Sequence, residues 1–208
     1  LVTGVYRPTE GEIRRNGENL VGLRPHAITA KGISRTFQTI RLWNNLTVLD
    51  NIRIAQHYQI RYTLIDAILN SPRLRQEEEH ITERSLELLD RFGLRRYAHE
   101  LAKNLPYGLQ RRVEIVRALS TNPRVLLLDE PAAGMNPGEI AELMELIQWV
   151  RKEFGITIWL IEHQMRVVMG ICERIKVLDF GETIAEGTPE EVQNNPRVLE
   201  AYLGEEEV

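Results

Sequence analysis

Residues 125–131 of the chain, VLLLDEP, carry the strongest indication of its fold. Four consecutive apolar residues are typical of a strand that is buried on both faces, as the strands of a parallel sheet are. Two adjacent acids, Asp129 and Glu130, end this strand, with one side chain pointing each way. In nucleotide-hydrolysing α/β proteins the first acid can hold Mg²⁺ while the second acts as a base toward water. The motif alone is equally compatible with a structural strand that meets solvent at two acids.

Strands and helices alternate in the second half of the chain, which favours an α/β fold with a parallel sheet. Apolar runs at residues 156–161 and 175–178 predict two more buried strands. Asn136 and Pro137 predict the start of a helix between the first two strands, because Asn caps helices and Pro fits their first turn. The sequence TPEE at residues 188–191 predicts a capping box that opens a later helix. The first of these helices has one apolar face, made of Ile140, Leu143, Met144, Ile147 and Val150.

The N-terminal part predicts a small antiparallel β-layer followed by a short helix and a strand. The dipeptide Asn-Gly at residues 16–17 lies between two extended stretches, as in a hairpin turn. Residues 26–31 predict a helix that ends at Gly32, and residues 33–38 predict a strand with Gln38 at its end.

Residues 48–101 predict a helical subdomain inserted between the two parts of the core. Gly93 marks the C-terminal end of its long helix. We therefore expect a core formed by residues 1–47 and 102–208. The long helix carries apolar residues at helical spacing, which are Ile81, Leu88, Leu89 and Phe92.

Composition excludes several classes of protein. The 208 residues are 43% hydrophobic and carry a net charge of -4, without a basic run, so nucleic acid is not the expected partner. No apolar run approaches the roughly 20 residues of a membrane-spanning helix. The single cysteine, Cys172, cannot form an internal disulfide, which favours a reducing, cytoplasmic setting.

Three further features accompany the acidic strand end. Residues 105–112, LPYGLQRR, form a glycine-containing turn that runs into an amphipathic helix, and a helix N-terminus beside Gly can bind phosphate. His163 follows the strand at residues 156–161, at the edge where ligands of open α/β sheets gather. A single His there is more often structural, but its ordered occurrence with Gln38 and the other motifs is difficult to obtain by chance.

Together these motifs resemble the nucleotide-binding subunits of ABC transporters, over essentially the whole chain. The resemblance implies a P-loop NTPase-like (RecA-like) α/β core, with ATP and Mg²⁺ as cofactors. Its Q-loop glutamine, signature motif, Walker B strand, D-loop and switch histidine match Gln38, LPYGLQRR, VLLLDEP, residues 133–136 and His163.

Four longer stretches are similar to the ATP-binding subunits of branched-chain amino-acid transporters. Subunits that power lipopolysaccharide export share a similar ending and are the alternative. The resemblance implies a head-to-tail dimer with a second ATP-binding subunit, docked on membrane permease subunits at the inner membrane, with a solute-binding protein as an indirect partner. The four stretches are TGVYRPTEGEI, RTFQTIRLWNNLTVLDNI, DEPAAGMNP and NNPRVLEAYLGEE.

The resemblance also implies roles for individual residues. Glu130 would polarise the attacking water, and His163 would contact the γ-phosphate. Asp129 and Gln38 would serve Mg²⁺. The resemblance further implies nucleotide contacts for Gln38, Tyr107, Gly108 and Asn136.

The chain departs from the family pattern at several positions. None of its four lysines lies in a G-x-x-x-x-G-K-[ST] loop, which in the family would come immediately before residues 1–4. Pro106 stands at the usual Ser of the signature, Leu109 at its Gln, and Asn136 at the D-loop Asp. We therefore expect residues 1–208 alone to be inactive, with uncovered, unpaired strands near residues 125 and 156.

Two other classes of protein are weighed against the transport ATPase. A non-hydrolysing fragment or pseudo-subunit would account for the missing phosphate loop. A non-transport ABC ATPase that acts on nucleic acid or ribosomes would be expected to have tandem cassettes or a long coiled insertion, and the sequence contains neither.

Overall fold

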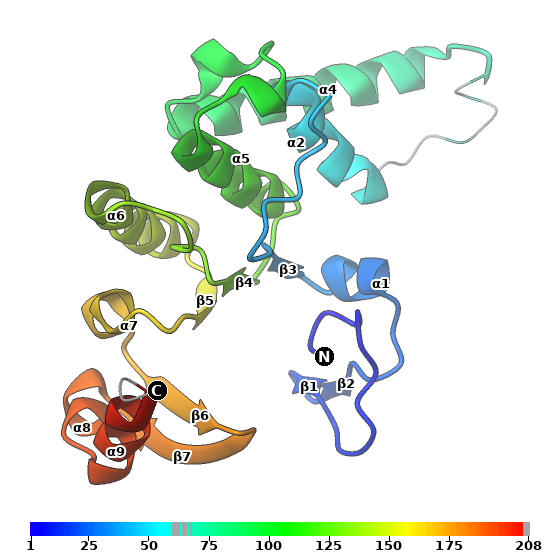
Figure 1. The fold of residues 1–208 in the computed structure, drawn as a ribbon. Helices are drawn as coiled ribbons and strands as arrows, with labels where there is room; N and C mark the ends of the chain where they lie inside the picture. Colours follow the sequence, from blue (N-terminus) through cyan, green and yellow to red (C-terminus); the bar gives the residue numbers. More distant parts are fainter. Residues whose placement is uncertain (60–62, 64–65, 67, 206–208) are drawn as a thin grey trace. The chain divides into compact units, whose positions relative to one another are not determined.

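The computed structural model describes residues 1–59, 63, 66 and 68–205 (Figure 1). The end of the expected core segment, residues 206–208, lies outside the described residues. The chain divides into two compact units. The first comprises Leu1–Pro131 and Gly155–Trp159, and the second comprises Ala132–Phe154 and Leu160–Val208.

The first unit begins with the predicted hairpin. Strands β1 (Arg14–Arg15) and β2 (Glu18–Asn19) pair antiparallel. The two turn residues, Asn16 and Gly17, both have positive φ, of 49° and 84°. A tight two-residue hairpin turn of this hand requires positive φ at both positions, which is why Asn-Gly predicts it.

The predicted helix and parallel sheet follow. Helix α1 (Pro25–Ala30) precedes β3 (Ile33–Arg35), which pairs parallel with β4 (Val125–Asp129). The sheet order is β3-β4-β5, with β5 spanning Thr157–Ile161. A buried cluster beside β3 and β4 contains Leu20, Ile28, Ile33 and Leu127.

Strand β3 is shorter than the sequence predicts. It ends at Arg35, so Gln38 lies three residues beyond the strand and not at its end. The Thr36 N–H still donates to the Leu127 carbonyl at 2.9 Å. The next carbonyls, of Phe37 and Gln38, accept hydrogen bonds from the side chain of Arg111 and not from a strand. The strand ladder therefore ends here.

A helical segment interrupts the sheet strands in the sequence. It contains α2 (Val48–Gln56), η1 (His57–Gln59), α4 (Pro72–Arg91) and η2 (Arg95–Tyr97). Its two ends meet, because Thr47 and Leu101 form an isolated antiparallel bridge. The chain then continues through η3 (Ala102–Asn104) into α5 (Tyr107–Leu119).

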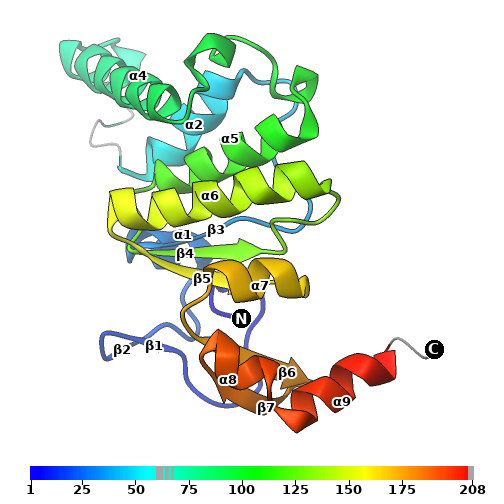
Figure 2. The same cartoon turned by 90° about the vertical axis from the view of Figure 1, so that its left-hand side faces the viewer.

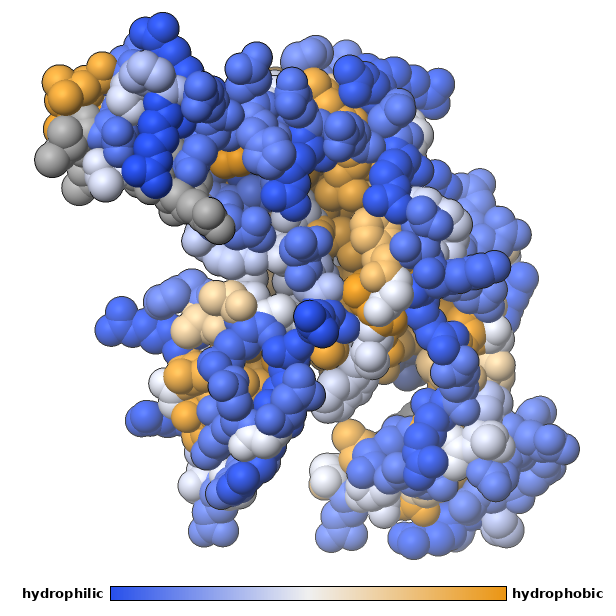
Figure 3. Space-filling view, turned by 180° about the vertical axis from the view of Figure 1, so that it is seen from behind, coloured by the Kyte–Doolittle hydropathy of each residue, from blue (hydrophilic) through white to orange (hydrophobic). Residues whose placement is uncertain are grey.

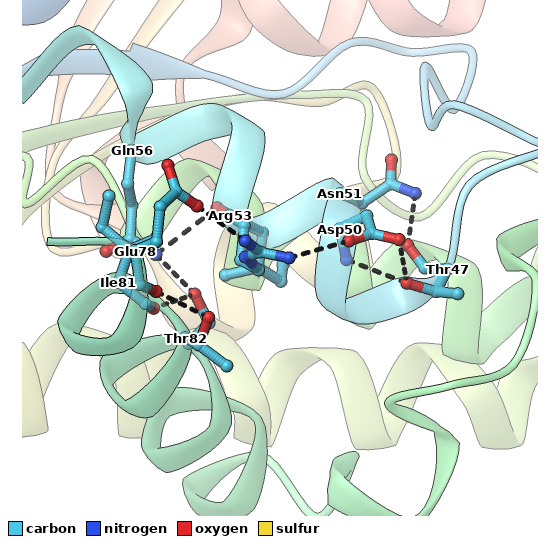
Figure 4. A network of polar contacts seen from close by, with 10 residues as sticks. Thr47, Asp50, Asn51, Arg53, Gln56, Glu78, Ile81 and Thr82 are labelled. Carbon is cyan, nitrogen blue, oxygen red and sulfur yellow. Dashed lines mark hydrogen bonds and ion pairs between the residues drawn. The ribbon is translucent and has the colours of Figure 1, made fainter. Parts of the chain in front are cut away.

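Polar side chains join α2 to α4 (Figure 4). Thr47 caps α2 by accepting the Asp50 N–H. Arg53 donates to Asp50 at 3.3 Å and to Glu78 of α4 at 2.7 Å. The two helices are therefore connected by an ion pair as well as by apolar packing.

Gly93 ends α4, as predicted. Its φ of 67° lets the N–H of Gly93 donate to the Asp90 carbonyl at 2.9 Å and the N–H of Leu94 donate to the Leu89 carbonyl at 2.8 Å. This pair of bonds is the Schellman arrangement, which satisfies the last carbonyls of a helix. Leu89 and Leu94 are buried beside it.

The second unit contains α6 (Pro137–Phe154), α7 (Met165–Ile171), α8 (Pro189–Gln193) and α9 (Pro196–Glu205). The buried side chains of α6 are Ile140, Leu143, Ile147 and Val150, which confirms the predicted apolar face except for Met144, which is only partly buried. Thr188 and Glu191 form the predicted capping box at the start of α8.

The second unit also corrects one prediction. Residues 175–178 form β6 (Ile175–Asp179), which pairs antiparallel with β7 (Glu182–Gly187) in a separate sheet and not in the parallel one. Phe180 and Gly181, both with positive φ, return the chain between them. Helices α8 and α9 lie against this hairpin (Figure 2).

The expectation of uncovered strands holds for only one of the two. Strand β4 is the central strand, and its Leu126, Leu127 and Leu128 are buried, so that expectation is wrong for it. In β5, which is at the edge of the order β3-β4-β5, Trp159 and Ile161 are each 53% exposed.

The surface is mixed in polarity. The face in Figure 3 is largely hydrophilic, with apolar residues in several separate patches. None of the helices in the described part of the chain is both long and apolar enough to cross a membrane.

Candidate functional site

The two acids lie where the sheet geometry places them, at the end of β4. Asp129 is the last residue of the strand, and its Oδ2 accepts from Arg35 Nη2 at 2.5 Å. Arg35 is the last residue of the neighbouring strand β3, so both side chains reach the same edge of the sheet. The ion pair fixes the direction of the Asp129 carboxylate, which is only 20% exposed.

Glu130 follows with a φ of 41°, in the left-handed region that a residue other than Gly or Asn rarely adopts. This conformation ends the strand. The direction of the Glu130 side chain therefore no longer follows the alternation of side chains along β4. Its Oε2 accepts from Gln38 Nε2 at 2.6 Å. Residues 92 positions apart in the sequence are thereby joined, and both belong to the predicted set.

The loop that carries Gln38 is held by two fully buried side chains of α5. Arg111 donates from Nη1 to the Phe37 carbonyl and from Nη2 to the Gln38 carbonyl, both at 2.7 Å. Glu114 accepts the Arg41 N–H at 3.3 Å and the Phe37 N–H at 3.5 Å, and it pairs with Arg111 at 2.6 Å. Neither role was predicted from the sequence. The available signal was a pair of opposite charges three positions apart on the buried face of a helix.

Cations and aromatic rings alternate along the same loop. The Phe37 ring has the guanidinium groups of Arg35 and Arg41 at 5.0 Å and 4.1 Å from its centroid. The Arg117 guanidinium lies 5.2 Å from the centroid of Trp43, which is 47% exposed. Burial lowers the pKa of Arg117, and the nearby Glu114 carboxylate opposes this shift. Arg35 thus brings positive charge to Asp129 at the sheet edge, and Arg117 places positive charge beside a partly exposed indole.

The signature residues Tyr107 and Gly108 are the first two residues of α5. The residue before them, Pro106, provides no side-chain capping bond. The first backbone N–H groups of a helix have no partner within it and lie at the positive end of its dipole. This end of α5 is therefore suited to an anionic group such as a phosphate. The Tyr107 hydroxyl accepts from Arg111 Nη2 at 3.2 Å.

In the second unit, His163 follows a carboxylate that binds three backbone N–H groups. Glu162 Oε1 accepts from Ala132 N at 3.0 Å, and Oε2 accepts from His163 N at 3.0 Å and from Gln164 N at 3.2 Å. Glu162 thus joins the start of the segment before α6 to the backbone of the switch histidine. The role of Glu162 was not predicted either, although its position next to His163 in the sequence is a signal for it.

Asn136 caps α6, as its sequence context predicts. Its Oδ1 accepts from Gly138 N at 2.9 Å and from Glu139 N at 3.0 Å, while Asn136 N donates to Glu139 Oε2 at 3.0 Å. The side-chain oxygen is therefore used within the helix. A nucleotide contact by Asn136 would have to come from its amide nitrogen.

The predicted residues thus fall into two groups. The first unit holds Gln38, Tyr107, Gly108, Asp129 and Glu130, of which Gln38 and Glu130 touch. The second unit holds Asn136 and His163.

The donor atoms at the end of β4 suit Mg²⁺. Among the residues that the structure describes, no group of three His, Cys, Asp or Glu side chains could hold a metal ion. Mg²⁺ in nucleotide sites, however, needs only one or two protein oxygens, because water and phosphates complete its shell. The Asp129 carboxylate and the amide oxygen of Gln38 fit this partial set.

Comparison with known sequences places the chain among transport ATPases. Residues 1–133 match the ABC transporter family profile, and residues 182–208 match that of branched-chain amino acid ATP-binding cassette transporters. The high-affinity branched-chain amino acid transport ATP-binding protein LivG of Salmonella typhimurium is 47% identical, over 98% of this chain and 80% of its own length. The lipopolysaccharide export system ATP-binding protein LptB of Haemophilus influenzae is 33% identical, over 99% and 79%.

Solved structures confirm the fold. A nucleotide-free ATP-binding cassette from an ABC transporter has a TM-score of 0.80 and 30% identity, covering 97% of this chain and 80% of that one. A dimeric post-hydrolysis cassette bound to ADP and Pi has a TM-score of 0.70 and 28% identity, covering 88% and 75%. These structures confirm the expected P-loop NTPase class. Because the family profile covers more than half of the chain and the LivG match covers nearly all of it, the chain belongs to the ABC transporter family, as an ATP-binding subunit.

Proposed function

We propose that this chain supplies the water-activating residues of an ATPase that powers the import of branched-chain amino acids. The observation that carries the hydrolytic role is the bond from the Gln38 amide to Glu130 at the end of β4. The substrate class is supported by the likeness to LivG and by the match of residues 182–208. LptB is the alternative, and its 33% identity against 47% favours the amino-acid transporter.

Glu130 accepts a proton from the attacking water, and the amide of Gln38 directs the carboxylate oxygen that does so. Asp129 and the amide oxygen of Gln38 would hold Mg²⁺, which supplies charge neutralisation on the phosphates. Arg35 keeps the Asp129 carboxylate oriented toward the sheet edge. His163 donates to the γ-phosphate, with its backbone held by Glu162.

The N-terminus of α5 serves the nucleotide of a second subunit. In a head-to-tail dimer, the N–H groups around Tyr107 and Gly108 donate to the phosphate bound by the partner, without the Ser hydroxyl that Pro106 lacks. The dimeric state of the cassette bound to ADP and Pi supports an assembly of two subunits. Further partners are membrane permease subunits at the cytoplasmic face of the inner membrane and, indirectly, a solute-binding protein.

The decisive test replaces Glu130 by Gln in the protein that carries the phosphate-binding loop of the family. We expect ATP binding to be preserved and kcat to fall by about 10² or more, because a positioned base is lost. Glu145→Gln, at an exposed position on α6, makes the same change of charge away from the site. Unchanged turnover in Glu130→Gln would remove the role of base from Glu130.

We further propose that Trp43 contacts a permease subunit. Trp43 is 47% exposed beside Arg117, and exposed aromatic residues are enriched at interfaces. A cysteine placed at Trp43 should crosslink to a permease subunit, and Trp43→Asp should reduce transport. Efficient transport by Trp43→Asp, with crosslinks only from other positions, would contradict this contact.

Residues 1–208 alone test the pseudo-subunit alternative. Without the phosphate loop, we expect no micromolar ATP affinity. Mixing them with a cassette that has its own loop should restore hydrolysis through Gly108, and Gly108→Asp should abolish the rescue. Rescue that survives Gly108→Asp would mean that the added cassette works alone.

A further inference from the structure

We propose that Arg111 and Glu114 are positioning residues that make the Gln38 loop move with the signature helix α5. The inference rests on the proposed ATPase function. Beyond that function, it connects two places mechanically. One is the N-terminal end of α5, which faces a partner's nucleotide, and the other is the Glu130 carboxylate of the chain's own site.

Two buried side chains of α5 make the central steps of this connection, and Arg117 adds a bond to the Arg41 carbonyl. Arg111 binds the carbonyls of Phe37 and Gln38, and Glu114 binds the N–H groups of Phe37 and Arg41. Both side chains have no exposed surface. Charged groups buried in this way hold their partners in a fixed direction, because no water competes for their bonds.

Stability alone does not explain the pair. Removing two charges from water costs about as much as their attraction returns, so a well-packed apolar pair would stabilise α5 equally well. An apolar pair could not bind the carbonyls of Phe37 and Gln38, where the chain has just left β3 and has lost its strand partners. The specific contribution of the pair is therefore the position of the loop.

The contacts continue in both directions. Arg111 Nη2 donates both to the Tyr107 hydroxyl at the start of α5 and to the Gln38 carbonyl. Gln38 then donates from its side chain to Glu130. A shift of α5 caused by a nucleotide at its N-terminus is thereby carried by direct bonds through Arg111 and Gln38 to Glu130.

The test replaces the pair by Arg111→Met with Glu114→Met, which keeps the side-chain volume without the charges. The matched control is Arg53→Met with Glu78→Met, which removes the ion pair between α2 and α4 and does not touch the loop. For both double variants we would measure hydrogen exchange at the amides of the Gln38 loop. We would also measure kcat and KM for ATP in the assembled transporter.

We expect exchange at the Phe37 and Arg41 amides to become about 10- to 100-fold faster, the range for losing bonds to a charged group. We expect kcat to fall about tenfold while KM for ATP stays within about twofold, because nucleotide binding does not use the pair. The control should change neither quantity. Equal effects in both double variants, or wild-type exchange and kcat in the first, would overturn the proposal.

A second variant guards against misfolding of the first. Arg111→Lys keeps the charge beside Glu114, but one ammonium group cannot replace the planar fork that donates to two carbonyls. We expect it to fold and to show intermediate exchange and kcat, and wild-type values would refute the inference. If the wild-type transporter shows no ATPase activity, the proposed function fails, while the exchange rates still decide whether the pair holds the loop.

Discussion

Glu162→Gln is expected to weaken the connection between the start of the α6 segment and the switch histidine. The carboxylate accepts three backbone N–H groups, from Ala132, His163 and Gln164, at 3.0 to 3.2 Å. A Gln side chain keeps one acceptor oxygen and turns an NH₂ group toward at least one N–H donor. Bonds to charged groups contribute about 1.5–3 kcal/mol each, so we expect the free energy of unfolding to fall by about 2 kcal/mol, since Glu162 is only half-buried.

The assay is thermal unfolding of the protein, followed by hydrogen exchange at the same three amides. For a chain of this size, about 2 kcal/mol corresponds to a Tm lower by about 4–8 °C. Glu173→Gln is the control, because it breaks a surface ion pair with Arg151 that is expected to contribute about 0–1 kcal/mol. Equal Tm shifts for the two variants, or unchanged exchange at Ala132 and His163, would show that Glu162 does not hold these segments together.

Three other predictions concern stability and reactivity. Gly93→Ala should lower the free energy of unfolding by about 1–2 kcal/mol, because its φ of 67° disfavours a side chain, and urea denaturation measures this loss. The backbone N–H of Thr188 and then its hydroxyl hold the pKa of Glu191 below its ordinary value, so the stabilisation by this cap is present at neutral pH and is lost as pH falls through the lowered pKa. Glu191→Gln should remove this dependence, whereas Thr188→Ala, which keeps the backbone N–H, should only weaken it, in acid titrations followed by circular dichroism. Burial raises the pKa of the Cys172 thiol, so alkylation at pH 8 should be slower in the folded chain than in urea, and equal alkylation rates would contradict this. The stabilisation from the protonated thiol is lost as pH rises above the ordinary thiol pKa.

Local signals in the sequence were sufficient wherever one residue type is required by the backbone. The hairpin at Asn16, the end of α4 at Gly93 and the caps at Asn136 and Thr188 were all predicted, because each depends on neighbours within a few residues. The acidic end of β4 belongs to the same class, since four apolar residues followed by two acids indicate both the strand and its end.

Partners far apart in the sequence were not predictable in this way. The apolar run at residues 175–178 is compatible with either a parallel or an antiparallel strand, and only its pairing with β7 decides between them. Arg111 and Glu114 look like ordinary helix charges until the loop more than 70 residues earlier is placed against them. That Gln38 and Glu130 share a site followed from the family resemblance, whereas their direct bond required the structure.

The bridge between Thr47 and Leu101 also has a consequence for how this protein can be changed. Since the helical segment begins and ends at one point of the backbone, its length is almost independent of the geometry of the sheet. Each doubling of a closed loop costs only about 0.6 kcal/mol in entropy, so related chains can lengthen, shorten or exchange this segment at little cost. For protein engineering, the bridge is a natural junction at which the segment from one transporter could be grafted onto the core of another.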